Sequence, residues 1–135
     1  ERSVNPKKVY CVDSGLVTAY TIKPETEEAS RLENTVFCQL RRTNKDIFYY
    51  KTRSGKEVDF VILRADGVCE LYQVSVSLSS PDTRERELGA LCEAMKELKI
   101  SRGTIITARE SRTIKLDEIR IDIVPVERWL LEYPA

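Results

Sequence analysis

Three strand patterns separated by two glycine turns, between residues 47 and 77, constrain the fold of this chain most strongly. The first, Ile47–Lys51, is rich in aromatic and β-branched residues, which favour strands. The second spans about Glu57–Leu63, and the Asp66-Gly67 pair that follows it is a strong hairpin signal. The third runs over about Val68–Val76. The stretch therefore predicts an antiparallel three-strand meander.

Two of these strands carry polar residues among apolar ones. Because side chains alternate across a strand, Asp59 is predicted to share a face with Val61. The other face of that strand would carry Val58, Phe60 and Ile62. Gln73 and Ser75 occupy alternate positions of the third strand, on one side of it. Polar groups inside apolar strands need hydrogen-bond partners or a function.

The rest of the chain alternates between helical and strand patterns. The elements expected are a helix over about 26–43, the meander, a helix that starts with Ser80 as cap and Pro81 at its first position, a strand over 103–108, a charged hairpin or loop, a strand over 119–124 and a helical tail over 126–133. Residues 8–12 form a further short apolar segment. This order predicts an α/β fold with a mixed central sheet flanked by helices.

Composition limits the classes of protein to which the chain can belong. Its 135 residues suit one domain, and the 22 basic and 22 acidic residues give a formal net charge of zero, so the whole chain provides no electrostatic argument for nucleic acid. The four cysteines are scattered and histidine is absent, which favours free thiols in a reducing cytoplasm over a zinc site. The apolar runs are too short to span a membrane.

Glu33 is the acidic residue of the first helix that stands out. It lies three and four positions before Val36 and Phe37, beside the face that should turn toward the core. It could be a boundary residue that reaches solvent or pairs with an arginine. It could also converge with Asp59 and Gln73 at one end of the sheet, where two or three oxygen atoms would suit Mg²⁺.

The order of these residues also resembles a known nuclease fold. A helix with Glu in LEN (32–34), a strand with Asp in GKEVDFVI (55–62), a strand with ELYQVS (70–75) and a following helix look like the core of the PD-(D/E)xK, or restriction-endonuclease-like, superfamily. More narrowly, these stretches together with NPKKVYCVDSGL (5–16) and IVPVERWLL (123–131) resemble the DUF4143 family over nearly the whole chain.

That resemblance implies a context and a site. Such a domain typically forms the C-terminal part of archaeal and bacterial ATPases, behind an AAA+ type P-loop module, so we expect residues 1–135 to be one excised domain with a flank at 1–25 and a core at 26–135. This chain has no phosphate-binding loop and hence no ATP site of its own. The superfamily pattern assigns metal binding to Asp59 and Gln73, an accessory acid to Glu33, and the catalytic lysine to the position of Ser75.

Two functions follow from these assignments. One is a Mg²⁺-dependent DNA endonuclease, in which the ion would activate water at Asp59 and Gln73. The other is a nuclease-like module that does not cut and binds the parent ATPase, DNA or further copies of itself. Ser75 has neither a positive charge nor a base, which favours the second unless Lys51, Lys56 or Arg84 reaches the site. A buried hydrogen-bond network of Glu33, Asp59 and Gln73 would also fit the second.

Overall fold

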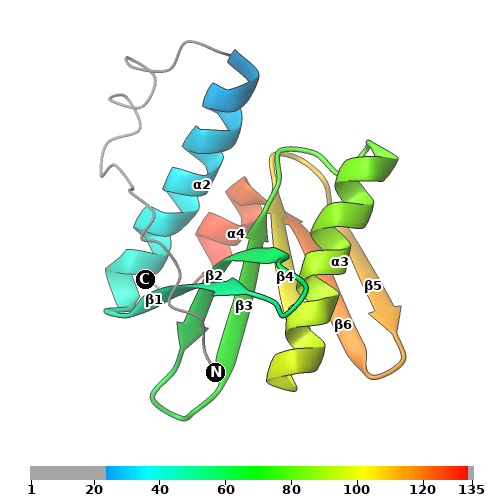
Figure 1. The fold of residues 1–135 in the computed structure, drawn as a ribbon. Coiled ribbons are helices and arrows are strands. Elements are labelled where there is room, and N and C mark those ends of the chain that lie inside the picture. The colour runs from blue at the N-terminus through cyan, green and yellow to red at the C-terminus, as the bar shows by residue number, and fades with distance from the viewer. Residues whose placement is uncertain (1–23, 134–135) are drawn as a thin grey trace.

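A six-stranded mixed sheet forms the centre of the structure, a computed structural model that describes residues 24–133 (Figure 1). Its strands are β1 (Ile47–Lys51), β2 (Glu57–Leu63), β3 (Cys69–Val74), β4 (Arg102–Thr107), β5 (Arg112–Leu116) and β6 (Ile119–Pro125). They lie in the order β1-β2-β3-β4-β6-β5. The predicted meander is antiparallel, β3, β4 and β6 are mutually parallel, and β5 is antiparallel to β6. The mixed α/β architecture is therefore confirmed for the described residues.

Helices cover both faces of the sheet. One face packs on α3 (Pro81–Leu98), and the other packs on α2 (Pro24–Thr43) and α4 (Val126–Glu132). Figure 1 shows α3 in front of the sheet and α4 behind it. The meander thus lies between two helical layers, and its side chains contribute to a core on each side.

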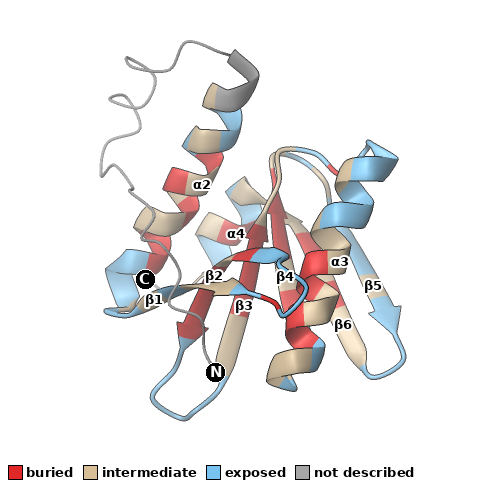
Figure 2. Ribbon diagram, in the orientation of Figure 1, coloured by how far each residue is buried: buried red, intermediate tan, exposed pale blue. Residues whose placement is uncertain are grey.

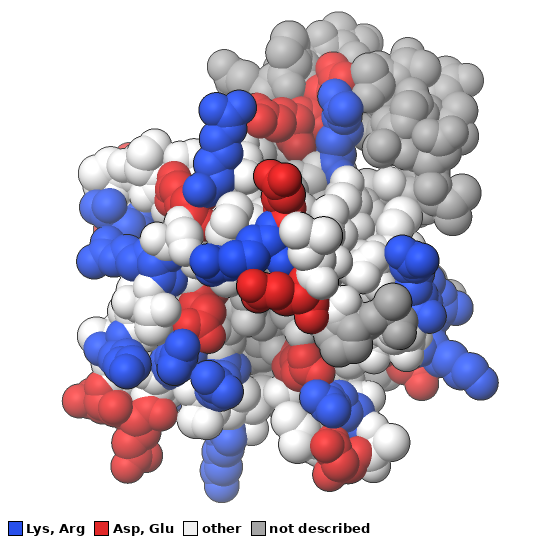
Figure 3. All heavy atoms as spheres, turned by 180° about the vertical axis from the view of Figure 1, so that it is seen from behind, with Lys and Arg blue, Asp and Glu red and all other residues white. Residues whose placement is uncertain are grey.

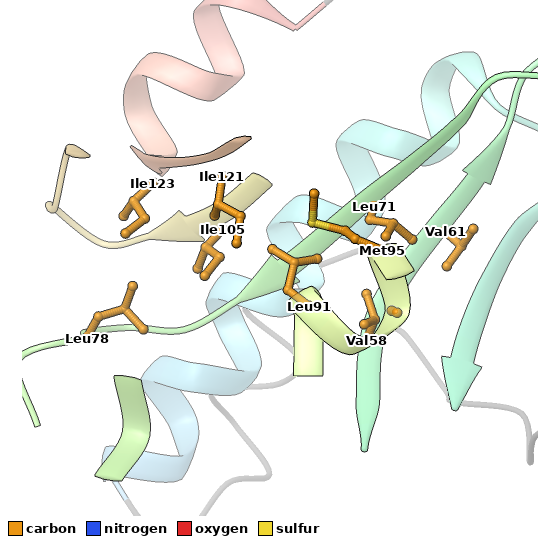
Figure 4. Close-up of a cluster of buried hydrophobic side chains, with 10 residues drawn as sticks. Val58, Val61, Leu71, Leu78, Leu91, Met95, Ile105, Ile121 and Ile123 are labelled. Carbon is orange, nitrogen blue, oxygen red and sulfur yellow. The ribbon is translucent and has the colours of Figure 1, made fainter. Parts of the chain in front are cut away.

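The two cores use alternate residues of the same strands. On the α3 face, Leu91 and Met95 point toward sheet side chains such as Leu71, Ile105 and Ile121 (Figure 4). On the other face, the buried cluster contains Val36, Leu40, Phe60, Ile62, Tyr72, Ile106 and Trp129. The buried residues run through the central strands, and the edge strand β5 has none (Figure 2).

Local sequence patterns predicted most of the element boundaries. The helix α2 begins at Pro24, two residues before the predicted start, because proline is tolerated in the first turn of a helix. The third strand is shorter than predicted, since it ends at Val74. The charged segment after β4 contains the strand β5, which forms a hairpin with β6. Ser80 is the N-cap of α3, but its side chain makes no capping hydrogen bond.

The predicted facing of β2 is wrong at one residue. Pairing with β1 shifts register between Phe48 and Tyr50, so one residue of β1, Tyr49, is opposite two of β2, Asp59 and Phe60. This bulge interrupts the alternation, and Val58 joins Val61 in the core under α3, whereas Phe60 lies in the core on the other face. A pure alternation rule cannot detect an extra residue of this kind.

The remaining predictions concern turns, cysteines and membranes. Gly55 and Gly67 take the positive φ values of 90° and 84° that their turns require. Three cysteines of the described segment are free and half-buried, namely Cys38, Cys69 and Cys92. No helix between residues 24 and 133 is long and apolar enough to cross a membrane. The predictions for residues 1–23, including the apolar segment 8–12, lie outside the described residues.

Candidate functional site

The cavity in which the predicted site residues meet lies at the end of the sheet where β2 and β3 separate. Backbone pairing of these strands extends from Leu63 and Cys69 to Phe60 and Tyr72 and stops there. Beyond that point a cavity of about 450 Å³ opens between the strands and the helices α2 and α3. Its walls include all four predicted residues, Glu33, Asp59, Gln73 and Ser75. We name this space the β2–β3 cavity.

Gln73 and Asp59 bridge the two separating strands. The Gln73 Oε1 atom accepts the Asp59 backbone N–H at 2.9 Å, and Nε2 donates to the Glu57 carbonyl oxygen at 3.0 Å. In return, Asp59 Oδ2 accepts the Val74 backbone N–H at 2.8 Å. Gln73 is only 3% exposed, so these bonds satisfy groups that water cannot reach. Both side chains replace the ladder hydrogen bonds that the separated backbones cannot form.

Glu33 and Ser75 complete the predicted set from opposite walls. Glu33 is half-buried on α2, as its spacing before Val36 and Phe37 predicted. Ser75 lies just after β3, and its hydroxyl donates to the Ser77 carbonyl oxygen at 3.0 Å. The four predicted residues are therefore brought together, although they come from three segments of the chain.

Glu87 of α3 is a cavity residue that the sequence analysis missed. Its side chain is 14% exposed and lies 3.4 Å from the Arg86 guanidinium. Burial raises the pKa of Glu87, and the charge of Glu33 raises it further, while hydrogen bonds from Arg86 and Gln73 oppose the shift. The signal was available, since Glu87 precedes the buried Leu91 by four residues on one helical stripe.

A further titratable group, Tyr49 of β1, responds to the acidic residues of β2. Burial and a hydrogen bond with Glu57 raise the pKa of Tyr49 to about 12, with added repulsion from the charges of Glu57 and Asp59. The cavity walls themselves carry Glu33, Glu57, Asp59 and Glu87 against Lys56 and Arg86. The site is therefore more acidic than basic.

Lys56 is the only one of the three proposed replacement cations that lines the cavity. It enters from the turn between β1 and β2, whereas Lys51 and Arg84 are not among the lining residues. The Lys56 ammonium extends along α3 toward Gly89, where a Cβ atom added to the glycine would lie 3.3 Å from Nζ. A cation thus reaches the cavity from a turn, and not from the position of Ser75.

The oxygen atoms of Asp59 and Gln73 are the ones that the resemblance assigns to Mg²⁺. The ion needs near-octahedral coordination by oxygen atoms, with one or two carboxylates and several waters. Here the Gln73 oxygen and one Asp59 oxygen are engaged by backbone N–H groups of the strands. Within residues 24–133, no three His, Cys, Asp or Glu side chains are grouped so as to hold a metal ion. Each of these oxygen atoms keeps a lone pair beside its hydrogen bond, so the metal role that the resemblance implies for Asp59 and Gln73 stays a prediction.

A second and wider groove lies on the face of α4. It measures about 630 Å³ and is lined by Glu70 of β3, whereas Gln73 of the same strand lines the β2–β3 cavity. Its arginines include Arg64, 3.3 Å from Glu70, and Arg120, 3.0 Å from Asp122. Among the described residues of this face, basic and acidic side chains are interleaved (Figure 3). The described residues that line this groove include four arginines and three carboxylates.

Comparison with known proteins assigns the chain to a family, but the matching proteins have no described activity. An uncharacterized protein of Haemophilus influenzae is 30% identical over 125 residues, which is 93% of this chain and 29% of that protein. The chain therefore spans less than a third of the relative it matches. No solved structure matches the chain. Residues 30–129 match the family described as Domain of unknown function (DUF4143), and the chain therefore belongs to the DUF4143 family.

Proposed function

We propose that this domain is a nuclease-like module that does not cut DNA and that serves a larger P-loop ATPase as a binding or assembly part. The observation that carries the proposal is the bridge between β2 and β3. Gln73 and Asp59, the two residues expected to bind a metal, use their side chains to join the strand backbones. Ser75 provides no positive charge where the nuclease pattern expects lysine.

A modular role also agrees with the length of the relative. The chain matches only 29% of the Haemophilus influenzae protein, as expected for one part of a longer chain. The partner that we propose is the ATPase module of the same protein, in the cytoplasm of an archaeal or bacterial cell. Contact with DNA, or with a second copy of the domain, would be further ways for the same module to act.

One observation favours a second candidate, a Mg²⁺-dependent DNA endonuclease. Lys56 lines the same cavity as Glu33 and Asp59, so a cation is present although Ser75 is not one. For this function Mg²⁺ would bind through the lone pairs that Gln73 Oε1 and the Asp59 carboxylate keep beside the backbone N–H groups that they accept. Gln73 brings no charge to such a site and Ser75 brings no base, which is why we rank the endonuclease second.

Cleavage assays separate the two candidates. Plasmid and linear DNA are incubated with excess protein and Mg²⁺ or Mn²⁺, beside the variant Asp59→Asn, which keeps an oxygen to accept the Val74 N–H but has no charge. We expect uncut DNA in every reaction and no heat of ion binding in a calorimetric titration. Cleavage that disappears in Asp59→Asn would establish the endonuclease instead.

The assembly role requires its own measurement. Light scattering and cross-linking of the full-length protein, and of the isolated domain mixed with its ATPase module, should detect a complex that contains this domain. A domain that stays monomeric and binds neither the ATPase module nor DNA would contradict the proposal.

A further inference from the structure

The turn between β1 and β2 forms one wall of the β2–β3 cavity. Gly55, Lys56 and Glu57 all line the space, opposite α2 and beside α3. Within the turn, the Thr52 N–H donates to the Lys56 carbonyl and the Gly55 N–H donates to the Thr52 carbonyl, at 2.8 and 2.9 Å. The turn therefore keeps its own shape, and its position depends on what holds it to the rest of the molecule.

Two carboxylates of α3 hold this turn. The Thr52 and Ser54 hydroxyls donate to the same oxygen of Glu93, at 2.9 and 2.6 Å. One helical turn further along, Glu97 accepts the Arg53 backbone N–H at 3.2 Å. Glu97 also accepts the hydroxyl of Tyr50, at 2.9 Å. Residues four apart lie on the same side of a helix, so both carboxylates face the turn together.

Apolar packing adds little to this attachment. Residues 53–57 are all exposed, and Thr52 is the buried residue of the turn, at 4% exposure. The Thr52 hydroxyl also accepts the Lys56 backbone N–H at 3.0 Å, which connects Glu93 to Lys56 through one side chain. Segments with few buried apolar contacts and exposed hydrogen bonds are the ones that open at the lowest free energy.

We propose that the β1–β2 turn is a hinged wall of the cavity, and that Glu93 and Glu97 are the positioning residues that keep it closed. When the two carboxylates release the turn, Gly55 and Lys56 swing away from α3 and the cavity widens toward solvent. The position of the turn determines how open the cavity is to solvent and where the Lys56 ammonium lies in it. Its importance rests on the proposed function, in which this cavity belongs to the working face of the module.

Amide hydrogen exchange of the isolated domain tests the hinge without DNA, metal or partner. In Glu93→Ala/Glu97→Ala, the amides of Arg53 and Lys56 should exchange about tenfold faster than in the wild type, because the Arg53 N–H loses its acceptor and the Thr52 hydroxyl, which accepts the Lys56 N–H, loses the carboxylate that positions it. Amides of β4 should exchange at the wild-type rate. An amine-specific reagent should also modify Lys56 faster, as measured by mass spectrometry.

A matched control and a milder pair of variants make the outcome decisive. Glu85→Ala removes an exposed carboxylate from the same helix and should leave the turn unchanged. If the double variant does not fold, the single variants Glu93→Ala and Glu97→Ala, each of which removes the acceptors of one carboxylate, decide the question. Wild-type exchange at Arg53 and Lys56, or an equal acceleration in β4, would overturn the hinge. Either result would overturn the hinge alone and would leave the proposed function unaffected. Conversely, DNA cleavage by the domain would overturn the proposed function and would leave the hinge unaffected.

Discussion

Gln73 makes hydrogen bonds that backbone groups make along the rest of the β2–β3 pair. Its amide both accepts and donates, and it can therefore satisfy the Asp59 N–H and the Glu57 carbonyl at the same time. A carboxylate could accept but could not donate. This difference explains why glutamine suits the position in a domain that uses it as a bridge, and it provides a direct test.

The substitution Gln73→Glu should destabilise the domain by about 2 kcal/mol at neutral pH, because it places a charge at a buried position and the Glu57 carbonyl loses its donor and faces that charge. Urea unfolding measures the change. The control is Gln39→Glu, since Gln39 is also buried but accepts a bond from Arg42 that a carboxylate keeps. An unchanged free energy of unfolding for Gln73→Glu would contradict the bridge.

Glu87 should give the domain a characteristic dependence on pH. Its pKa is raised above the ordinary 4.5, mainly by burial, so the folded state holds this proton more tightly than the unfolded state does. Stability should therefore fall as the pH rises from 4.5 through the raised pKa. Glu87→Gln removes this loss, and its stability relative to the wild type should be greater at about pH 7 than at about pH 4.

Urea unfolding of both proteins across this pH range measures the effect of Glu87. The exposed Glu85, on the same helix, provides the control substitution Glu85→Gln. A difference between wild type and Glu87→Gln that does not change with pH would show that the carboxyl is not held in a dehydrated position.

At the scale of elements, α3 approaches its neighbours closely at two glycines with opposite consequences. A Cβ atom on Gly103 of β4 would lie 3.0 Å from Met95 Sδ and 3.1 Å from Leu91 Cδ2, both in the packed core. On Gly89, in α3 itself, the nearest atom would be the ammonium of Lys56 at 3.3 Å, the far end of a flexible side chain. The packed side chains around Gly103 cannot easily make room for a methyl group, whereas Lys56 can move away from Gly89.

Alanine at these two glycines should therefore change stability in opposite directions. Gly103→Ala should destabilise by about 1–3 kcal/mol through overpacking. Gly89→Ala should stabilise by about 0.5–1 kcal/mol, because alanine is the better helix former and Lys56 can move aside. Thermal or urea unfolding measures both, and each variant acts as the control for the other. A stabilising Gly103→Ala would mean that α3 and β4 are not in close contact.

At the scale of the whole molecule, two cores share one sheet. The β2 strand contributes Val58 and Val61 to the core under α3, and Phe60 and Ile62 to the core under α2 and α4. Because the same strands support both cores, neither core can persist when the other is lost. Trp129, the only tryptophan of the chain, is buried on the side away from α3 and can report on this coupling.

We expect a single cooperative transition in which Trp129 fluorescence and far-ultraviolet circular dichroism have the same midpoint. Leu91→Ala, which empties part of the α3 core, should lower both midpoints together and destabilise by about 2–5 kcal/mol. The exposed Leu131→Ala is the control, since that side chain is 83% exposed. Two separate midpoints would indicate that the cores unfold independently.

The predictable part of this fold is the part that local patterns encode. Aromatic and β-branched runs, glycine turns and helical stripes were sufficient to identify five of the strands and the three described helices. The segment of β5 was predicted only as a charged hairpin or loop, because a half-buried Ile114 alone interrupts its exposed residues, a pattern that suits both. The spacing of Glu33 and the alternation of Gln73 and Ser75 predicted side chains that could meet.

Local sequence patterns were enough to predict most helices and strands, the mixed α/β class and the polar residues that could form a site. Folding in three dimensions was needed to establish that β2 and β3 separate beyond Phe60 and Tyr72, that Gln73 and Asp59 bridge the gap, and that Glu87 and Lys56 join them. A polar side chain satisfies whichever unpaired group the fold brings within hydrogen-bond distance, and the separation of the strands determines which groups are unpaired.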